Sequence, residues 1–498
     1  MQVEHVLEKL YLGNHVAELD QNLSKYFIRN AAFSSLINGR ADLIAGDKGT
    51  GKSAIFKYLK EQYTSIEQLN NIEIVTGFNR KGSPMFNDLK RAGDLNEQTY
   101  IIIWKTYIFS LLGNWVLDFL DGHRSKSLRE LDWLLTNKLD LRSKNDKPAG
   151  IFSNLVSWAK NHLVPTAIGV ESSIDPLGFP VFNPKIELGE RISQSEQADD
   201  FIPYIPDDNA LRVLHDVLVE YDLTIWILLD RLDEAFIALP NIEKPALRAL
   251  LRTYLDLLEF ERIGLKLFVR KDLFRKIVSG GFVNLTHISA QRIEIDWYKD
   301  DLLSVLCERI RQSDSFLETI QGQSLTDKQL FNTIFPYRMG NGSNHQITWR
   351  WMLSYIRDGN NVYSPRNLID LVNKAIYQQI RREQRFKRKF EKNQPLIEYQ
   401  SLRMAYEQLS KERVIDTLLA EVDAEVKVLI EALRNGKSEH NLDSLKQLFG
   451  VDNESHILSY ASALRDIGLF EIKGQTFEIP HLYRHGLNIK RGKAFSAG

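Results

Sequence analysis

A glycine-rich stretch near the amino terminus has the residue types that bind phosphate. It reads Gly46-Asp47-Lys48-Gly49-Thr50-Gly51-Lys52-Ser53, with Ala54 directly after it, and matches the pattern G-x-x-x-x-G-K-[ST]. The glycines let backbone N–H groups turn inward toward a β-phosphate, and the helix expected next presents its positive end to the same oxygens. The Lys52 ammonium can reach the β- and γ-phosphates, and the Ser53 hydroxyl can ligate Mg²⁺. Residues 46–54 are therefore predicted to bind ATP and Mg²⁺; the alternative is a glycine-rich turn with a solvated lysine.

A second candidate group follows an apolar run and is acidic. The run Trp226-Ile227-Leu228-Leu229 leads into Asp230-Arg231-Leu232-Asp233-Glu234. At the tip of a strand, Asp230 can hold Mg²⁺ through water, and Asp233 or, preferably, Glu234 can orient and deprotonate an attacking water. Apolar strands that end in acids are common in proteins of every kind. The phosphate-binding pattern upstream is what favours the catalytic interpretation.

The spacing of these acids resembles the Walker B segment of STAND and NACHT NTPases, a branch of the AAA+ superfamily. The resemblance extends over about residues 36–380 and is strong only at the two motifs, and Arg231 departs from it because those proteins usually carry a small residue there. Together with Ile479-Pro480-His481-Leu482-Tyr483-Arg484, the motifs also resemble those of compact bacterial P-loop ATPases, which are often encoded beside a partner enzyme in antiphage defence.

The resemblance implies two sensor arginines. Arg270 ends the apolar run Leu265–Val269 and would face the γ-phosphate, although a solvent-facing charge is an equal alternative. The segment Ser364-Pro365-Arg366-Asn367 resembles the sensor 2 segment of initiator-type lids. Ser364 can cap a helix whose first turn holds Arg366, and an ordinary helix start explains the same residues. Arg275 and Arg292 are candidates for arginine fingers acting between subunits, and nothing in the sequence distinguishes them from surface arginines.

Apolar periodicity predicts an α/β fold with a parallel doubly wound sheet, followed by a helical region and by three helices and a hairpin in the outline of a winged helix. With the phosphate-binding pattern, the resemblance implies that the fold is a P-loop NTPase followed by a helical lid and a carboxy-terminal winged helix. The expected strands of the sheet are 41–45, 72–77, 223–229 and 265–269. The expected helices are 4–39, 52–64, 97–120, 209–220, 243–260, 367–379, 414–434, 442–449 and 455–467. A terminal hairpin is expected from 469–472 and 476–479, because Lys473-Gly474 is typical of a two-residue turn.

Four parts are expected along the chain. They are an amino-terminal helical segment (1–35), an ATPase core (36–300) with an insertion at about 121–205, a helical lid (301–405) and a winged-helix domain (406–498). The insertion is rich in Pro and Gly and contains one amphipathic stretch, 128–139, and two alternating segments, 168–171 and 179–188.

Composition limits the function classes. The 498 residues carry 64 Lys+Arg against 65 Asp+Glu, a net charge of −1, so binding to nucleic acid would require a local patch. The densest basic run is 381–389, which includes Arg381, Arg382 and Arg385. The single cysteine, Cys307, excludes a disulfide framework within the chain. No signal peptide and no membrane span is recognised, which favours a cytoplasmic protein with no membrane partner.

The leading hypothesis is an ATPase that acts as a switch on a separate effector or sensor protein and assembles as a homo-oligomer. The alternative is an initiator-like ATPase that binds DNA through the winged helix and the basic helix 381–389. Tyr26, Phe27 and Phe33 lie close enough to the loop in sequence to meet a base, and core packing explains them equally well.

Overall fold

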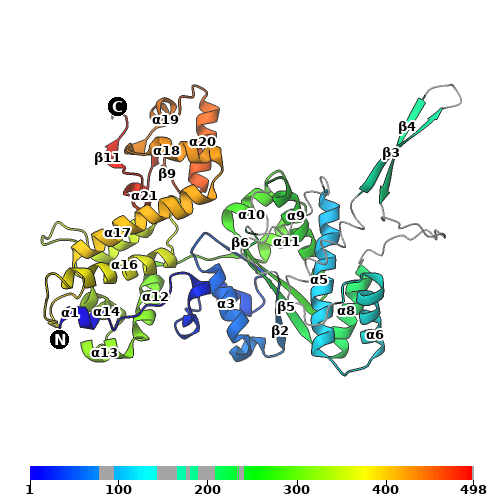
Figure 1. Cartoon of the computed structure of the whole chain (residues 1–498), viewed down its shortest axis with the longest axis horizontal. Helices are drawn as coiled ribbons and strands as arrows, with labels where there is room; N and C mark the ends of the chain where they lie inside the picture. The colour runs from blue at the N-terminus through cyan, green and yellow to red at the C-terminus, as the bar shows by residue number, and fades with distance from the viewer. Residues whose placement is uncertain are drawn as a thin grey trace. The chain divides into compact units, whose positions relative to one another are not determined.

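The computed structural model describes residues 1–77, 95–142, 208–232, 234 and 240–495, and the backbone of 165–174 and 180–188. Figure 1 shows the elements of the chain, coloured from the amino to the carboxy terminus. Contacts divide the chain into two units. The sheet unit comprises residues 32–45 and 59–294, and the lid unit comprises residues 1–31, 46–58 and 295–498.

The sheet unit contains a five-stranded parallel sheet in the order β2-β5-β6-β1-β7. Its strands are β1 (Leu43–Gly46), β2 (Ile72–Thr76), β5 (Thr224–Leu229), β6 (Ile263–Arg270) and β7 (Arg292–Glu294). The four predicted strands are present, and the short edge strand β7 is an addition that the sequence did not indicate. The α/β fold of the P-loop NTPase type, followed by a helical lid, is therefore confirmed.

Helices pack around this sheet (Figure 1). They are α2 (Ala31–Ile37), α5 (Glu97–Phe119), α6 (Lys126–Trp133), α8 (Asp208–Glu220), α9 (Pro240–Leu257), α10 (Lys271–Val278) and α11 (Leu285–Ala290). Helix α5 is long and apolar enough to cross a membrane, but 72% of its apolar window is buried. Its residues Trp104, Tyr107 and Phe109 are fully buried in the core of the unit, so α5 has the packing of a core helix.

The predicted insertion is described in part. After α6, the chain forms the single π-helical turn η5 (Leu134–Lys138). Strands β3 (Pro165–Ile174) and β4 (Pro180–Leu188) form a separate antiparallel pair with Gly169 opposite Lys185. Residues 143–164, 175–179 and 189–207 lie outside the described residues.

The prediction of a helix over 4–39 was wrong for most of that range. Only α1 (Val3–Leu7) and α2 are α-helical, with two 3₁₀ turns at Ala17–Leu19 and Leu23–Lys25 between them. Gly13 has a φ of +73°, which a helix does not accommodate. The carbonyl oxygens of Leu12 and Asn14 accept from Arg309 instead of from helical N–H groups.

The lid unit holds the predicted helical lid. Its helices are α12 (Lys299–Arg311), α13 (Asp314–Ile320), α14 (Asp327–Ile334), α15 (Thr348–Ile356), α16 (Pro365–Glu383) and α17 (Tyr399–Arg413). Helix α16 begins where the sequence predicted, because the Ser364 hydroxyl accepts from the Asn367 N–H at 3.3 Å. It ends at Glu383, so the basic run does not continue as a helix to Arg388.

The last part of the chain has the element order of a winged helix. It contains α18 (Ala424–Leu433), β8 (Lys437–His440), α19 (Leu442–Phe449), α20 (Glu454–Asp466), β9 (Glu471–Lys473), β10 (Thr476–Glu478), α21 (His481–Arg484) and β11 (Lys490–Lys493). Its four strands lie in the order β11-β8-β10-β9, and the turn of the hairpin is Gly474-Gln475. The prediction of one helix over 414–434 was wrong, because the π-helical segment η7 (Val414–Leu419) ends before Asp423 caps α18.

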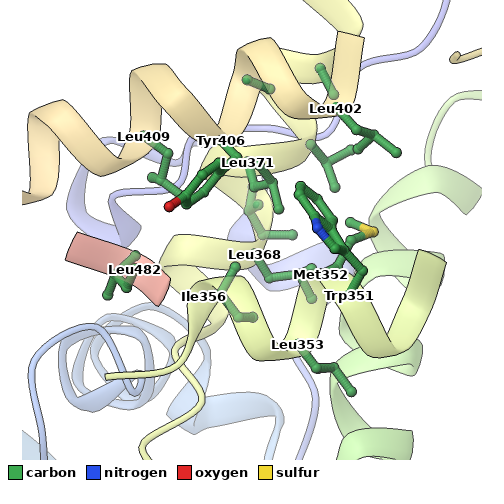
Figure 2. Packing of buried hydrophobic residues seen from close by; sticks show 14 of the residues in the cluster. Trp351, Met352, Leu353, Ile356, Leu368, Leu371, Leu402, Tyr406, Leu409 and Leu482 are labelled. Carbon is green, nitrogen blue, oxygen red and sulfur yellow. The ribbon is translucent and has the colours of Figure 1, made fainter. Parts of the chain in front are cut away.

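One hydrophobic core joins the lid helices to this carboxy-terminal group. Figure 2 shows Leu482 of α21 beside Leu409 and Tyr406 of α17, in the cluster that also holds Leu368 of α16 and Ile356 of α15. The Tyr406 hydroxyl donates to the His481 carbonyl oxygen at 2.7 Å, and the His481 ring stacks on that of Tyr355 at 4.3 Å. The segment 479–484, which the sequence singled out, therefore fixes the carboxy-terminal group to the lid.

Replacing Leu482 should loosen this junction. We expect Leu482→Ala to lower the free energy of unfolding of the lid unit by about 2–5 kcal/mol, because it leaves a cavity in a closed core. Urea titration followed by tryptophan fluorescence measures the loss. The matched control is Leu458→Ala on α20, where the side chain is 46% exposed and the loss should be small. Equal losses of stability in the two variants would contradict the placement of Leu482 in the core that joins the lid helices to the carboxy-terminal group.

Candidate functional site

The predicted phosphate loop has the backbone that its glycines permit. Gly49 and Gly51 have φ angles of +78° and +109°, in the region that favours glycine. A Cβ at Gly46 would lie 2.5 Å from the Thr50 hydroxyl oxygen. The Thr50 hydroxyl donates to the Asp47 carbonyl oxygen at 2.8 Å, which closes the loop on itself.

Lys52 begins helix α3 (Lys52–Gln62) and reaches back across the loop. Its Nζ donates to the carbonyl oxygens of Gly46 at 2.7 Å and Asp47 at 3.1 Å. Ser53 and Ala54 follow in the first turn of α3, whose positive end faces the loop. A cation, a hydroxyl and a helix amino terminus thus meet at one short segment.

The first turn of α16 lies directly on this loop. The Ser364 hydroxyl donates to the Gly49 carbonyl oxygen at 3.1 Å, and the Arg366 N–H approaches the same oxygen at 3.5 Å. A Cβ added at Gly49 would lie 2.4 Å from the Ser364 hydroxyl oxygen and 3.1 Å from the Arg366 Cβ. The structure therefore places the predicted sensor Arg366 beside the phosphate loop, and glycine at 49 is what permits the approach.

Two further residues hold the loop within the lid unit, and the sequence had indicated neither. The Trp297 indole N–H donates to the Thr50 carbonyl oxygen at 2.7 Å. Lys48 forms an ion pair with Glu421, which lies between η7 and α18. Glu421 is 373 positions from Lys48 along the chain, so no local pattern could have indicated it.

Asp358 lies in the turn that connects α15 to α16. Its carboxylate accepts from the N–H groups of Asn360 at 2.9 Å and Val362 at 3.0 Å. The pKa of Asp358 is raised to about 7, chiefly by burial. The negative charge of Asp47 in the phosphate loop also raises it, while the two backbone hydrogen bonds act to lower it.

The same turn is packed on the carboxy-terminal group. The Gly359 N–H donates to the Gly468 carbonyl oxygen at 2.7 Å, and a Cβ at Gly359 would lie 2.4 Å from the Phe470 carbonyl oxygen. Arg357 pairs with Glu471 at 2.8 Å. The turn before Ser364 is therefore in contact with β9 and the residues that precede it.

The amino-terminal segment wraps the helix that follows the loop. Lys57 of α3 donates to the carbonyl oxygens of Ala17, Glu18 and Asp20, the last at 2.7 Å. Of the aromatic candidates for a base site, Phe27 stacks on Tyr58 of α3 at 4.1 Å. Tyr26 and Phe33 are buried, and Tyr26 is hydrogen-bonded to Asp20 under Arg309, so both have core roles.

In the sheet unit, the acids follow β5 as predicted. Asp230 comes directly after the buried strand and is itself 4% exposed. Arg231, the departure from the resembled family, has a φ of +59°. Its guanidinium lies 3.6 Å from the carboxylate of Glu234, whose N–H donates to the Arg231 carbonyl oxygen at 3.0 Å. Arg231 thus forms a tight turn with Glu234, while Asp233 lies outside the described residues.

Arg270 ends β6 and is held by a neighbour. Its Nε and Nη2 donate to the Asp272 carboxylate at 3.0 Å and 2.7 Å, a bidentate pair. Burial alone would raise the pKa of Asp272, but the Arg270 guanidinium leaves it lowered overall. Of the two finger candidates, Arg292 lies over the Phe274 ring and near Glu294, whereas Arg275 is exposed.

The sheet brings three of the predicted positions to one edge. Gly46 ends β1, Arg270 ends β6 and Asp230 follows β5, and these strands are consecutive in the order β5-β6-β1. The carboxyl ends of parallel strands lie at the same edge of a sheet, where ligands of open α/β sheets bind. Arg270 is therefore placed on the strand between those of Gly46 and Asp230.

The basic run 381–389 is partly used in structural contacts. Arg382 pairs with Glu398, and Arg388 pairs with the buried Glu383 at 2.7 Å and donates to the Leu396 carbonyl oxygen. Arg381 lies over the Tyr377 ring. The remaining cations of the run, Arg385, Lys387 and Lys389, are exposed and take no part in these contacts.

Comparisons with known proteins show distant structural similarity. No family model and no curated protein matches the chain. Among solved structures, the Aeropyrum pernix ORC2 protein is 12% identical with a TM-score of 0.42, and the comparison covers 94% of this chain and 97% of that one. A Walker-type ATPase of Pyrococcus abyssi is 10% identical with a TM-score of 0.41, covering 93% and 96%. The Aeropyrum pernix ORC1 protein in complex with DNA is 12% identical with a TM-score of 0.36, covering 95% and 96%.

The raised pKa of Asp358 gives stability a pH dependence. Below about pH 4 the Asp358 carboxyl is protonated in both the folded and the unfolded chain. Between about pH 4 and 7 it ionises only in the unfolded chain. We therefore expect wild type to lose stability relative to Asp358→Asn as pH rises through this window, by at most about 1.4 kcal/mol per pH unit. Urea titrations across the window test this, with the exposed Asp443→Asn as control. A stability difference that does not change with pH would contradict it.

Proposed function

We propose that the chain binds and hydrolyses ATP as a molecular switch of the AAA+/STAND type. The observation that carries this proposal is the Ser364–Gly49 hydrogen bond, through which the lid helix lies on the phosphate loop. Residues 46–54 would hold the phosphates, with Lys52 exchanging its bonds to loop carbonyl oxygens for stronger ones to phosphate. Ser53 and Asp230 would hold Mg²⁺, which would neutralise charge on the β- and γ-phosphate oxygens.

In this proposal, Glu234 positions and deprotonates the attacking water, and Asp233 supports it. Arg231 supplies the turn that presents Glu234 and restrains its carboxylate, which suits a slow hydrolase. Arg270 and Arg366 sense the γ-phosphate. Arg270 would have to leave the Asp272 fork to do so, whereas the backbone of Arg366 already lies on the loop.

The switch would act through the lid. Release of the γ-phosphate changes what Arg366 can bind, and Ser364 links that change to the loop backbone. The turn 357–363 and the Lys48–Glu421 pair extend the link to the carboxy-terminal group. A separate effector or sensor protein would read the position of that group, in a cytoplasmic homo-oligomer, and antiphage defence is the setting that the motif resemblance favours.

The domain assignment belongs to this proposal. An amino-terminal segment (1–35), a core (36–300), a lid (301–405) and a winged helix (406–498) describe the functional parts. The contact-based units divide differently, because residues 46–58 and the amino-terminal segment pack with the lid helices.

An initiator-like DNA-binding ATPase is the second candidate. The element order of the carboxy-terminal group supports it. Two observations weigh against DNA binding by the hairpin β9–β10 and by the basic run 381–389. The hairpin lysine, Lys473, is paired with Glu478 at 2.6 Å and Glu471 at 3.3 Å. In the basic run, Arg382 and Arg388 are paired with Glu398 and Glu383.

Phosphate release from ATP tests the main proposal. We expect Lys52→Ala to lose nucleotide binding, and Glu234→Gln to keep Mg-ATP binding while turnover falls about 10²–10⁴-fold. Lys60→Ala, an exposed lysine of the same helix, is the control and should behave as wild type. The assay is run with and without DNA, and mass in solution is recorded alongside. Tight Mg-ATP binding by a wild type that never turns over would replace the ATPase with a nucleotide-gated scaffold.

The lid contact is tested by Ser364→Ala. We expect affinity for ATP to fall about 2–30-fold, as a lost helix cap implies, with less change for ADP because only ATP carries the γ-phosphate. Isothermal titration with both nucleotides gives the ratio. Thr326→Ala removes the cap of α14 in the same unit without touching the loop and should leave the ratio unchanged. If both variants alter the ratio of ATP to ADP affinity alike, Ser364 acts only as a helix cap and its contact with Gly49 has no role in sensing the nucleotide.

A further inference from the structure

One edge of the carboxy-terminal sheet carries a group of exposed cationic side chains. Strand β11 contributes Lys490, Arg491 and Lys493, and the adjacent strand β8 contributes Lys437. All four side chains are exposed. Among the described residues, none of the four has an ion pair with a carboxylate. We name Lys437, Lys490, Arg491 and Lys493 the cationic edge.

A β-bulge determines which side chains share the exposed face. Lys490 is opposite Lys437 and Lys493 is opposite Glu439, so three steps on β11 span two on β8. Without the extra residue, side chains three positions apart would point to opposite faces of the sheet. On β8 the alternate face, Ser438 and His440, is buried. The bulge therefore keeps both lysines of β11 beside Lys437 in solvent.

The bulge is built into the sheet. The Ser438 hydroxyl is fully buried, donates to the Gly492 carbonyl oxygen at 3.2 Å and accepts from the Gly492 N–H at 3.1 Å. Gly492 has a φ of +125°, which favours glycine. The Ala494 N–H then resumes the ladder with the Glu439 carbonyl oxygen at 2.8 Å. The lysines are consequently fixed on a sheet instead of on a flexible segment.

This arrangement has a cost in the isolated chain. Lys437 and Lys490 are a like-charged pair directly opposite each other on adjacent strands, which destabilises a sheet. In the register of β11 with β8, Glu439 is the one acid, against the three cations Lys437, Lys490 and Lys493. A bound polyanion would remove the repulsion, whereas solvent and salt only screen it.

We propose that the cationic edge binds the phosphate backbone of a nucleic acid. Neither β8 nor β11, both of which the structure describes, contains an exposed large apolar residue, whereas the centre of a protein–protein interface is apolar and aromatic. Interfaces with DNA are more polar and much more positive, and their phosphate contacts carry no sequence information. Binding is independent of base sequence and does not depend on ATP turnover. It also uses neither the hairpin β9–β10 nor the run 381–389.

The salt dependence of binding tests the proposal. Wild-type full-length chain is titrated against a mixed-sequence 30-base-pair duplex at several salt concentrations. We expect the triple variant Lys437→Ala, Lys490→Ala, Lys493→Ala to bind at least about tenfold more weakly and to flatten the slope of log K against log[salt] by about 3, one for each lost phosphate contact. Replacing the same three lysines by arginine should retain binding and the slope, since arginine also pairs with phosphate.

The matched control changes three exposed, unpaired cations of the basic run, Arg385→Ala, Lys387→Ala and Lys389→Ala. It should leave the slope close to that of wild type. If this control loses binding and the edge variant does not, the proposal is overturned in favour of the basic run. If wild type binds poly-glutamate and not duplex DNA, the partner is an acidic protein and the proposal also fails. Lys52→Ala should bind DNA as wild type does, so loss of turnover cannot be mistaken for loss of this surface.

Discussion

A single serine hydroxyl connects the lid helix α16 to the phosphate loop, and the proposed switch depends on this connection. Ser364 caps the lid helix by accepting from Asn367 and at the same time donates to the Gly49 carbonyl oxygen. One hydroxyl provides one donor and can accept as well, so the two contacts use it without competition. The contact also requires that Gly49 lack a side chain and that Pro365 begin the helix immediately. The position of Arg366 follows from these constraints.

Continuity of the core determines how far a change at the loop can extend. The lid helices and the carboxy-terminal group share one hydrophobic cluster, with Leu482 inside it and Tyr406 hydrogen-bonded to His481. A close-packed core resists gradual deformation, so such a body moves as a whole or rearranges between discrete states. The carboxy-terminal group is thus better suited to move with the lid than to swing on a linker. The cationic edge would move with it.

What the sequence predicted well was local. The glycine-rich turn between β1 and α3, the buried strands β1, β5 and β6, and the start of α16 at Ser364 are encoded by neighbouring residues with fixed backbone demands. The contacts that the sequence did not indicate are long-range or depend on environment. Lys48 meets Glu421 across 373 positions, and Asp358 has its raised pKa because of what buries it. Strands β8 and β11 consist largely of charged residues, so they lack the apolar alternation by which strands are recognised.

The sheet order also affects when the site can form during synthesis. Strand β1, which leads into the phosphate loop, lies between β6 and β7, whose residues come more than two hundred positions later. The residues that contact the phosphate loop from the lid unit, Ser364 and Glu421, come later still in the chain. A chain emerging from its amino terminus therefore carries the loop sequence long before it has the strands that frame it, and non-local parallel pairing is slow to form. Nucleotide would be recognised only by a nearly complete chain, so binding reports that most of the protein has been made and folded.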